Sequence, residues 1–211
     1  NASQANGALI VRPGAYHETV QFKDGMRVFG EQSGVILDAG TGHFTAGNNL
    51  MLANLTFTGH GPDIVTGSGT GAFIVANCIV QKDSSRGFNL SGYRKVDFSA
   101  MLFSQDSFGT YGISASNCDT LSISDARFDT CGEAGLSLST IGYVSIRNTL
   151  FKHHNHSGII LTDCIGLVQY STFARNLSGI TVSRGTVIIK NNIIANNVGY
   201  AINQSNSPAL S

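Results

Sequence analysis

Tryptophan is absent from this chain, proline occurs only three times, and charged residues make up 12% of the sequence. That charged share is about half the usual value for a soluble domain. The 13 acidic and 13 basic side chains give a formal net charge of zero. The surface therefore has no overall positive field to attract nucleic acid, and we expect no nucleic-acid partner.

Long apolar runs are also missing. None approaches the roughly 18 residues that a membrane-spanning helix needs, so no membrane span is expected. The four cysteines show no CxxC spacing, which argues against a zinc knuckle. No cofactor or metal is expected, and no motif supports calcium. Because the 211 residues start at Asn1 without a methionine, we interpret them as a single domain, 1–211, of a larger protein.

What the chain does contain is a repeat. Apolar anchor residues recur along it at intervals of 23, 23, 25, 23, 22 and 21 residues. Segments such as TLSIS (120–124) and VSIRN (144–148) alternate with period two, which is typical of strands. No window carries a convincing helical stripe. The anchors are Phe57, Val80, Phe103, Phe128, Phe151, Phe173 and Ile194.

A period near 23, made of short strands and turns, predicts an all-β solenoid of about nine rungs. Successive rungs would stack in register about 4.8 Å apart, so that like residues form ladders. Phe and Ile ladders would fill the interior. Cys118 and Cys164 fall two rungs apart on one ladder, which is too far for a disulfide. We expect all four cysteines to be free thiols that pack as small apolar residues.

The repeat resembles the right-handed parallel β-helix of the pectin-lyase-like superfamily. The opening stretch IVRPGAYHETVQFKDGMRVFGE (10–31) is similar to the first coil of many sugar-processing members. The resemblance implies a polysaccharide partner and an extracellular, periplasmic or cell-surface location. It leaves the activity open, because the fold hosts lyases, hydrolases, esterases, epimerases and adhesins. The motifs of polygalacturonases, pectin methylesterases and alginate epimerases are incomplete or absent.

Two outward strips of the predicted coil carry little acid–base chemistry. One is a ladder of hydroxyl and amide side chains that includes Ser114, Ser137 and Thr181. It suits binding to a sugar or another surface. The other strip precedes each anchor and includes Ile79, Leu102 and Leu150. We expect a neighbouring domain or an oligomer partner to cover that apolar strip.

The turns that follow the anchors form a third strip, and there charge gathers. Eight of the 26 charged side chains and three of the six histidines lie in five turns between residues 81 and 179. Acids, bases and imidazoles converge nowhere else along the chain. The candidate catalytic residues are Asp106, Asp129, Lys152, His153, His154 and Arg175. The candidate substrate-binding residues are Lys82, Arg86, Phe108, Tyr111 and Glu133.

The histidines of KHHNHSG (152–158) allow three interpretations. They bind a metal, act as acid–base or substrate contacts, or lie exposed in a polar turn. A zinc site would need a third ligand beside His154 and His156. The second interpretation predicts proton abstraction next to a uronate carboxylate, as in a lyase or an epimerase. His153 or His154 would be the base, and Lys152 or Arg175 would neutralise the carboxylate. The alternative is a non-catalytic solenoid of a surface protein or adhesin.

Overall fold

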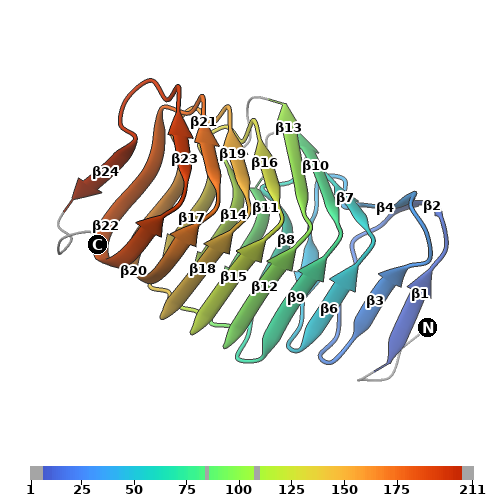
Figure 1. The fold of residues 1–211 in the computed structure, drawn as a ribbon. Helices are drawn as coiled ribbons and strands as arrows, with labels where there is room; N and C mark the ends of the chain where they lie inside the picture. Colours follow the sequence, from blue (N-terminus) through green and yellow to red (C-terminus); the bar gives the residue numbers. More distant parts are fainter. Residues whose placement is uncertain (1–6, 84–85, 107–109, 206–211) are drawn as a thin grey trace.

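The computed structural model describes residues 7–83, 86–106 and 110–205. These residues form one coil of parallel strands, with the N-terminal rung at one end and the C-terminal rung at the other (Figure 1). The described residues contain no helix, and hence none that could span a membrane. The all-β solenoid that the repeat predicts is confirmed.

Each rung contributes strands to three faces of the coil. Face 1 contains β5 (Phe44–Ala46), β8 (Asp63–Ser68), β11 (Arg86–Ser91), β14 (Tyr111–Ser116), β17 (Ala134–Ser139) and β24 (Ile202–Ser205). Face 2 contains β1 (Ala8–Val11), β3 (Arg27–Gly30), β6 (Leu50–Ala53), β9 (Ala72–Ala76), β12 (Lys95–Ser99), β15 (Thr120–Ser124) and β18 (Tyr143–Arg147). Two long strands run across both faces: β20 (Ser157–Gln169) and β22 (Ser178–Lys190).

Face 3 is a separate sheet of nine strands, one for each rung. It contains β2 (Gly14–His17), β4 (Val35–Asp38), β7 (Thr56–Thr58), β10 (Ile79–Asp83), β13 (Leu102–Asp106), β16 (Arg127–Asp129), β19 (Leu150–Lys152), β21 (Thr172–Ala174) and β23 (Ile193–Ala195). The register joins residues one period apart, as in Phe128 opposite Phe151. The predicted ladders are therefore present.

Phenylalanine fills the interior along the axis of the coil. The rings of Phe103, Phe128, Phe151 and Phe173 stack face to face, with centroids 4.4, 4.9 and 4.9 Å apart. All four are fully buried. Buried and outward residues alternate along the strands of all three faces, as in β14, β15 and β19. The four cysteines are buried and free, as predicted, and burial raises the pKa of Cys78 to about 12.

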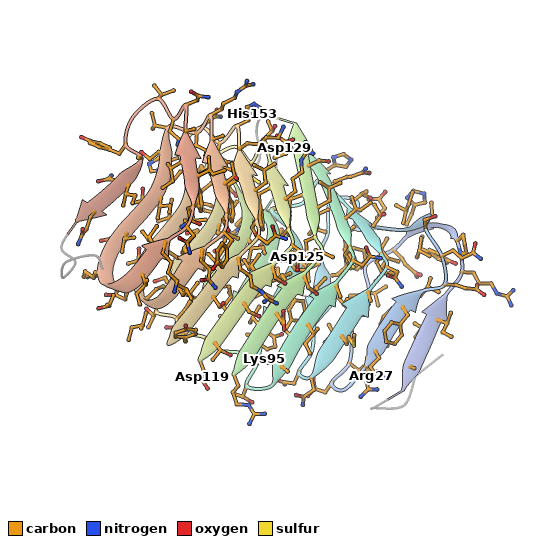
Figure 2. All side chains as sticks on the ribbon, viewed as in Figure 1. Arg27, Lys95, Asp119, Asp125, Asp129 and His153 are labelled. Carbon is orange, nitrogen blue, oxygen red and sulfur yellow. The ribbon has the colours of Figure 1, made fainter. Side chains whose placement is uncertain are left out.

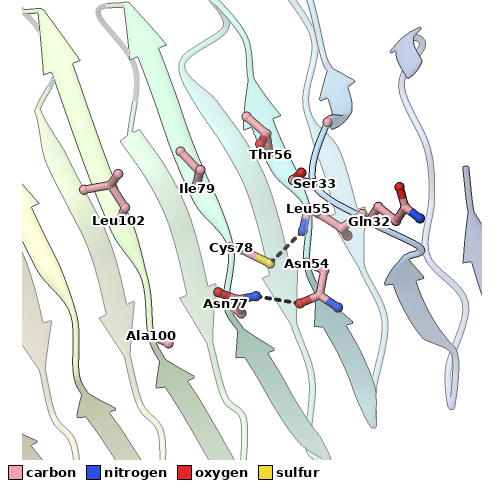
Figure 3. Close-up of a pocket in the computed structure, with 11 residues that line it drawn as sticks. Gln32, Ser33, Asn54, Leu55, Thr56, Asn77, Cys78, Ile79, Ala100 and Leu102 are labelled. Atoms are coloured by element: carbon pink, nitrogen blue, oxygen red, sulfur yellow. Dashed lines mark hydrogen bonds between the residues drawn. The ribbon is translucent and has the colours of Figure 1, made fainter. Parts of the chain in front are cut away.

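From the β6–β7 turn onward, a single left-handed residue turns the chain from face 2 to face 3 on each of seven rungs. These residues are Asn54, Asn77, Ala100, Asp125, Asn148, Tyr170 and Asn191, with φ between 47° and 58°. Asparagine tolerates this conformation better than other L-residues do. Its amide also bonds along the axis: Asn77 Nδ2 donates to Asn54 Oδ1 at 2.7 Å (Figure 3). Ala100 interrupts that ladder on the next rung.

We therefore predict that Ala100→Asn raises the free energy of unfolding by about 1 kcal/mol. The new amide would relieve the strain of a left-handed alanine and donate to Asn77. Urea unfolding at fixed pH measures the change. Ala100→Gly is the control, because it relieves the backbone strain without supplying an amide. If the glycine variant gains as much as the asparagine variant, the ladder hydrogen bond contributes nothing.

Candidate functional site

A cluster of charged side chains surrounds one carboxylate where face 3 meets the turn strip. Asp129 Oδ2 forms ion pairs with Arg127 Nη2 at 2.8 Å and with Lys152 Nζ at 2.9 Å. His153 Nδ1 lies 3.1 Å from Asp129 Oδ1. These four residues, Arg127, Asp129, Lys152 and His153, are called the turn group below; Figure 2 labels Asp129 and His153 at this edge. The period-two alternation of β16 and β19 sends Phe128 and Phe151 inward and the charged residues outward.

Asp129 is held in its ionised form. Partial burial pushes the pKa of its carboxyl upward, but hydrogen bonds from Arg127, Lys152 and His153 outweigh that effect and leave the pKa well below the usual range. Thr130 donates a further hydrogen bond to the same carboxylate at 3.1 Å. One negative charge thus faces two permanent positive charges. The turn group carries a net positive charge that suits an acidic ligand.

The carboxylate of Asp129 also determines which nitrogen of His153 carries the proton. An ionised carboxylate only accepts hydrogen bonds, so the Nδ1 of His153 is the donor. In the neutral ring the lone pair then lies on Nε2. The His153 side chain is 37% exposed, whereas that of Asp129 is 17% exposed. The arrangement presents a solvent-reachable imidazole that is oriented by a carboxylate and able to accept a proton.

Arg175 and His153 border the same surface hollow, of about 360 Å³. Residues of three successive rungs line it, including Leu177 and Val198. Arg175 is exposed and follows β21 by one position. The described residues give it no ion pair with a carboxylate, in contrast to Lys152. Lys152 and Arg175 were both predicted to contact a substrate carboxylate. Because Lys152 already forms an ion pair with Asp129, Arg175 is the better candidate.

His154 was predicted as a possible base in the turn, but the structure buries it. The residue is only 2% exposed, so it borders the same hollow as His153 without presenting a reachable imidazole there. Its Nδ1 accepts a hydrogen bond from the backbone N–H of Cys131 at 3.0 Å. A Cβ added to Gly135 would lie 3.1 Å from His154 Nε2, which shows how closely the ring packs. His154 braces the turn from inside.

On the next two rungs, asparagine side chains accept the equivalent hydrogen bond from the backbone of the preceding rung. Asn176 Oδ1 accepts from the backbone N–H of His154 at 3.0 Å, and its Nδ2 donates to the carbonyl of Phe151. Asn197 repeats both bonds one rung later, to Asn176 and Phe173. His154 thus occupies a position that asparagine fills elsewhere. This interior ladder explains why two adjacent histidines have different environments.

A second polar cluster lies at the start of the strands of face 1. Arg86 donates through Nε and Nη2 to both carboxylate oxygens of Asp63, which is buried. On the following rungs Tyr111 bonds Glu133, and this hydrogen bond, with burial, raises the pKa of Tyr111 to about 12. We call Asp63, Arg86, Tyr111 and Glu133 the strand-entry group. The structure brings together three of the predicted substrate-binding residues, Arg86, Tyr111 and Glu133.

Three predicted residues cannot be placed in either cluster. Phe108 lies outside the described residues, as do the side chains of Lys82 and Asp106. Their strands place the backbone of Asp106 opposite Asp83 and that of Lys82 opposite Gln105. Sequence reasoning missed Asp63 because the count of turn charges began one rung later. It also missed Arg127, whose position two residues before Asp129 on one strand was the overlooked signal.

Two other surfaces formed by the described residues carry no such charged cluster. The predicted hydroxyl ladder on face 1 is present, with Ser114, Ser137, Ile160 and Thr181 in register. A groove of about 530 Å³ follows the corner between faces 2 and 3, and its lining residues include no charged side chain (Figure 3). Within the described part of the chain, no group of three His, Cys, Asp or Glu side chains could hold a metal ion. A partner on the apolar strip stays a prediction.

The stacked parallel rungs define a β-helix, and comparison with known proteins places the chain in a β-helix family. A family model described as "Right handed beta helix region" matches residues 33–164 and 105–210. The chain therefore belongs to the right-handed β-helix family. No curated protein matches it.

Two solved structures share the fold. The first is the enzymatically active domain of bacteriophage CBA120 tailspike protein 2, with a TM-score of 0.67 and 15% identity. The match covers 94% of this chain and 37% of that one. The second is the A-module of the Azotobacter vinelandii mannuronan C-5 epimerase AlgE6, with a TM-score of 0.60 and 12% identity. It covers 97% of this chain and 70% of the module. At these identities the likeness shows the fold alone.

The interior role of His154 leads to a prediction about stability. His154→Ala should lower the free energy of unfolding by about 3 kcal/mol, because it leaves a cavity and an unpaired N–H at Cys131. His154→Asn should keep most of the wild-type stability, since asparagine makes the equivalent bonds on the next rung. Urea unfolding compares the two variants. Equal destabilisation by both would show that the ring has a role that asparagine cannot replace.

The ion pairs of Asp129 predict a pH dependence. Its folded pKa lies below the unfolded value of about 3.9, so its contribution is full above about pH 5 and is lost as the pH falls. Asp129→Asn should cost on the order of 1–2 kcal/mol at pH 7. The gap between wild type and variant should shrink between pH 5 and pH 2. A gap that stays constant over this range in urea unfolding would contradict the assignment.

Proposed function

We propose that this chain binds and processes an acidic polysaccharide at the turn group, by a reaction of the uronate lyase or epimerase type. The observation that carries the proposal is the Asp129–His153 pair, 3.1 Å apart, beside the exposed cation Arg175. A net positive site attracts a polymer of uronic acids. The β-helix folds of an epimerase module and of an enzymatically active tailspike domain support a carbohydrate substrate by analogy.

Proton abstraction next to a carboxylate needs a base and a group that stabilises the resulting negative charge. In the proposed reaction His153 Nε2 takes the proton from C5 of a uronate, and the electron pair moves into the carboxylate. Arg175 stabilises that carboxylate. In a lyase, the pair then forms the C4–C5 double bond as the C4 oxygen leaves and takes up a proton from water. In an epimerase, C5 takes a proton from water on its opposite side.

The roles within the turn group then differ. Asp129 is a positioning residue, because it holds the His153 ring in the tautomer that can accept a proton. Lys152 and Arg127 keep Asp129 ionised. Asp129 thus has a positioning role, although the sequence placed it among the candidate catalytic residues. Of Lys152 and Arg175, the two predicted partners of the substrate carboxylate, Arg175 takes that role. Hydrolysis by two free carboxylates finds less support, because Asp129 and Asp63 are both paired with cations.

Incubation with alginate and with polygalacturonate tests the proposal. Ultraviolet absorbance of the unsaturated product reports lyase activity, and proton NMR of the uronate residues reports epimerisation. His153→Ala should lower the rate by about 10²–10⁴-fold. The matched control is His156→Ala, in the same turn, because the His156 ring bonds the Ser157 hydroxyl rather than Asp129. Activity that survives His153→Ala would overturn the proposal.

The second candidate is a non-catalytic solenoid that binds a surface through face 1. The in-register hydroxyls of Ser114, Ser137 and Thr181 favour it, because such a ladder has no acid or base but many hydrogen-bonding groups. Glycan-array binding that is lost in Ser114→Ala and Ser137→Ala, and kept in His153→Ala, would support this function. No product from either polymer would then be expected.

A further inference from the structure

The outward side chain that directly follows the inward residue of each face 3 strand, from β2 to β19, belongs to one continuous ladder. From β2 to β19 the register places these residues opposite one another, rung after rung. All are exposed or half-buried, while the residue before each of the last six is buried. We call this set the exit ladder: His17, Asp38, Thr58, Gln81, Ser104, Asp129 and Lys152.

Both ends of the exit ladder contain a carboxylate–imidazole pair. His17 Nδ1 lies 2.9 Å from Asp38 Oδ2 at one end, as His153 Nδ1 lies 3.1 Å from Asp129 Oδ1 at the other. The backbone N–H of Gly40 and the ring of His17 lower the pKa of Asp38, so this carboxylate is also ionised at neutral pH. Between the two ends, the ladder offers only uncharged groups that donate and accept hydrogen bonds.

A row that is apolar at four of its six positions runs beside this polar ladder on the same face. Two residues earlier in each strand, the outward positions are Ile36, Thr56, Ile79, Leu102, Arg127 and Leu150. Three of them, Thr56, Ile79 and Leu102, also line the 530 Å³ groove shown in Figure 3. A sugar ring has an apolar face and a hydroxyl edge. Adjacent apolar and polar rows match those two parts of each ring.

The spacing of the ladder favours a polysaccharide over other linear polymers. Rungs repeat every 4.8 Å or so, close to the length of one sugar unit in an extended chain, and six steps span about 29 Å. Single-stranded nucleic acid would need large aromatic side chains for base stacking, and the exit ladder contains no Phe, Tyr or Trp. The cations at the Lys152 end, together with Arg127, suit the carboxylates of an acidic polymer.

We infer that the exit ladder is an extended binding track for a linear uronate polysaccharide, about six sugar units long and parallel to the axis of the coil. This inference rests on the proposed function, since the turn group forms one end of the track. Gln81, Ser104 and Thr58 hydrogen-bond sugar hydroxyls along it. The His17–Asp38 pair forms the distal end, four rungs away from Asp129.

Calorimetry with purified oligogalacturonates and oligomannuronates of two, four, six and eight units tests the track. A His153→Gln background prevents turnover during the measurement. Affinity should rise by about threefold for each added sugar up to six units, and then level off. Gln81→Ala should reduce the ratio of six-unit to two-unit affinity by about tenfold. The matched control is Ser122→Ala, an outward residue on face 2, which should leave that ratio unchanged.

The outcomes separate this inference from the proposed function. Affinity that is independent of length, or a ratio unaffected by Gln81→Ala, overturns the track. The proposed function would still stand if His153→Ala abolishes turnover of the polymer. A length dependence lost in Ser114→Ala and kept in Gln81→Ala would place the polymer on face 1 instead. Circular dichroism of each variant confirms that the coil is intact, which is expected for these surface substitutions.

Discussion

Parallel backbone hydrogen bonding from one rung to the next is the constraint on which the rest of this protein depends. It pairs residues about 23 positions apart, as between Phe128 and Phe151, and repeats the pairing along the coil. Because the pairing is in register, each position along the rung becomes a ladder. Phenylalanine stacks on phenylalanine in the interior, and asparagine bonds asparagine at the corner between faces 2 and 3. Each candidate binding surface of the protein is built from one or more of these ladders.

The same constraint explains how chemistry assembles without a deep cavity. Arg127 and Asp129 share one strand, whereas Lys152 and His153 come from the next rung. Stacking brings the four side chains within ion-pair distance. A change of one residue on one rung therefore alters the electrostatics of its neighbours. Asp129 is the centre of this arrangement, because its single charge orients His153 and holds two cations.

Ladders also show that similar side chains can have opposite roles. His153 and His154 are neighbours in the chain, but the backbone turns between them. His153 has a left-handed conformation and faces solvent, while His154 enters the interior and takes the place that Asn176 and Asn197 take on later rungs. Polar side chains inside the turns are thus tied to backbone groups of the adjacent rung. Charge at the surface and hydrogen bonding inside the turn are separate requirements of one short segment.

The sequence by itself determined the solenoid, its period, its buried anchors and the free cysteines, because period-two strands and a 23-residue repeat leave few other ways to bury Phe and Ile. It also indicated the pairing of Asp129 with Lys152, since register follows from the period. The direction of each turn side chain does not follow from spacing. Turns break the alternation, so only the tertiary structure decided that His154 is buried, that Arg127 joins Asp129, and that Asp63 holds Arg86. Those contacts depend on where a side chain leaves the coil, which the adjacent rung determines.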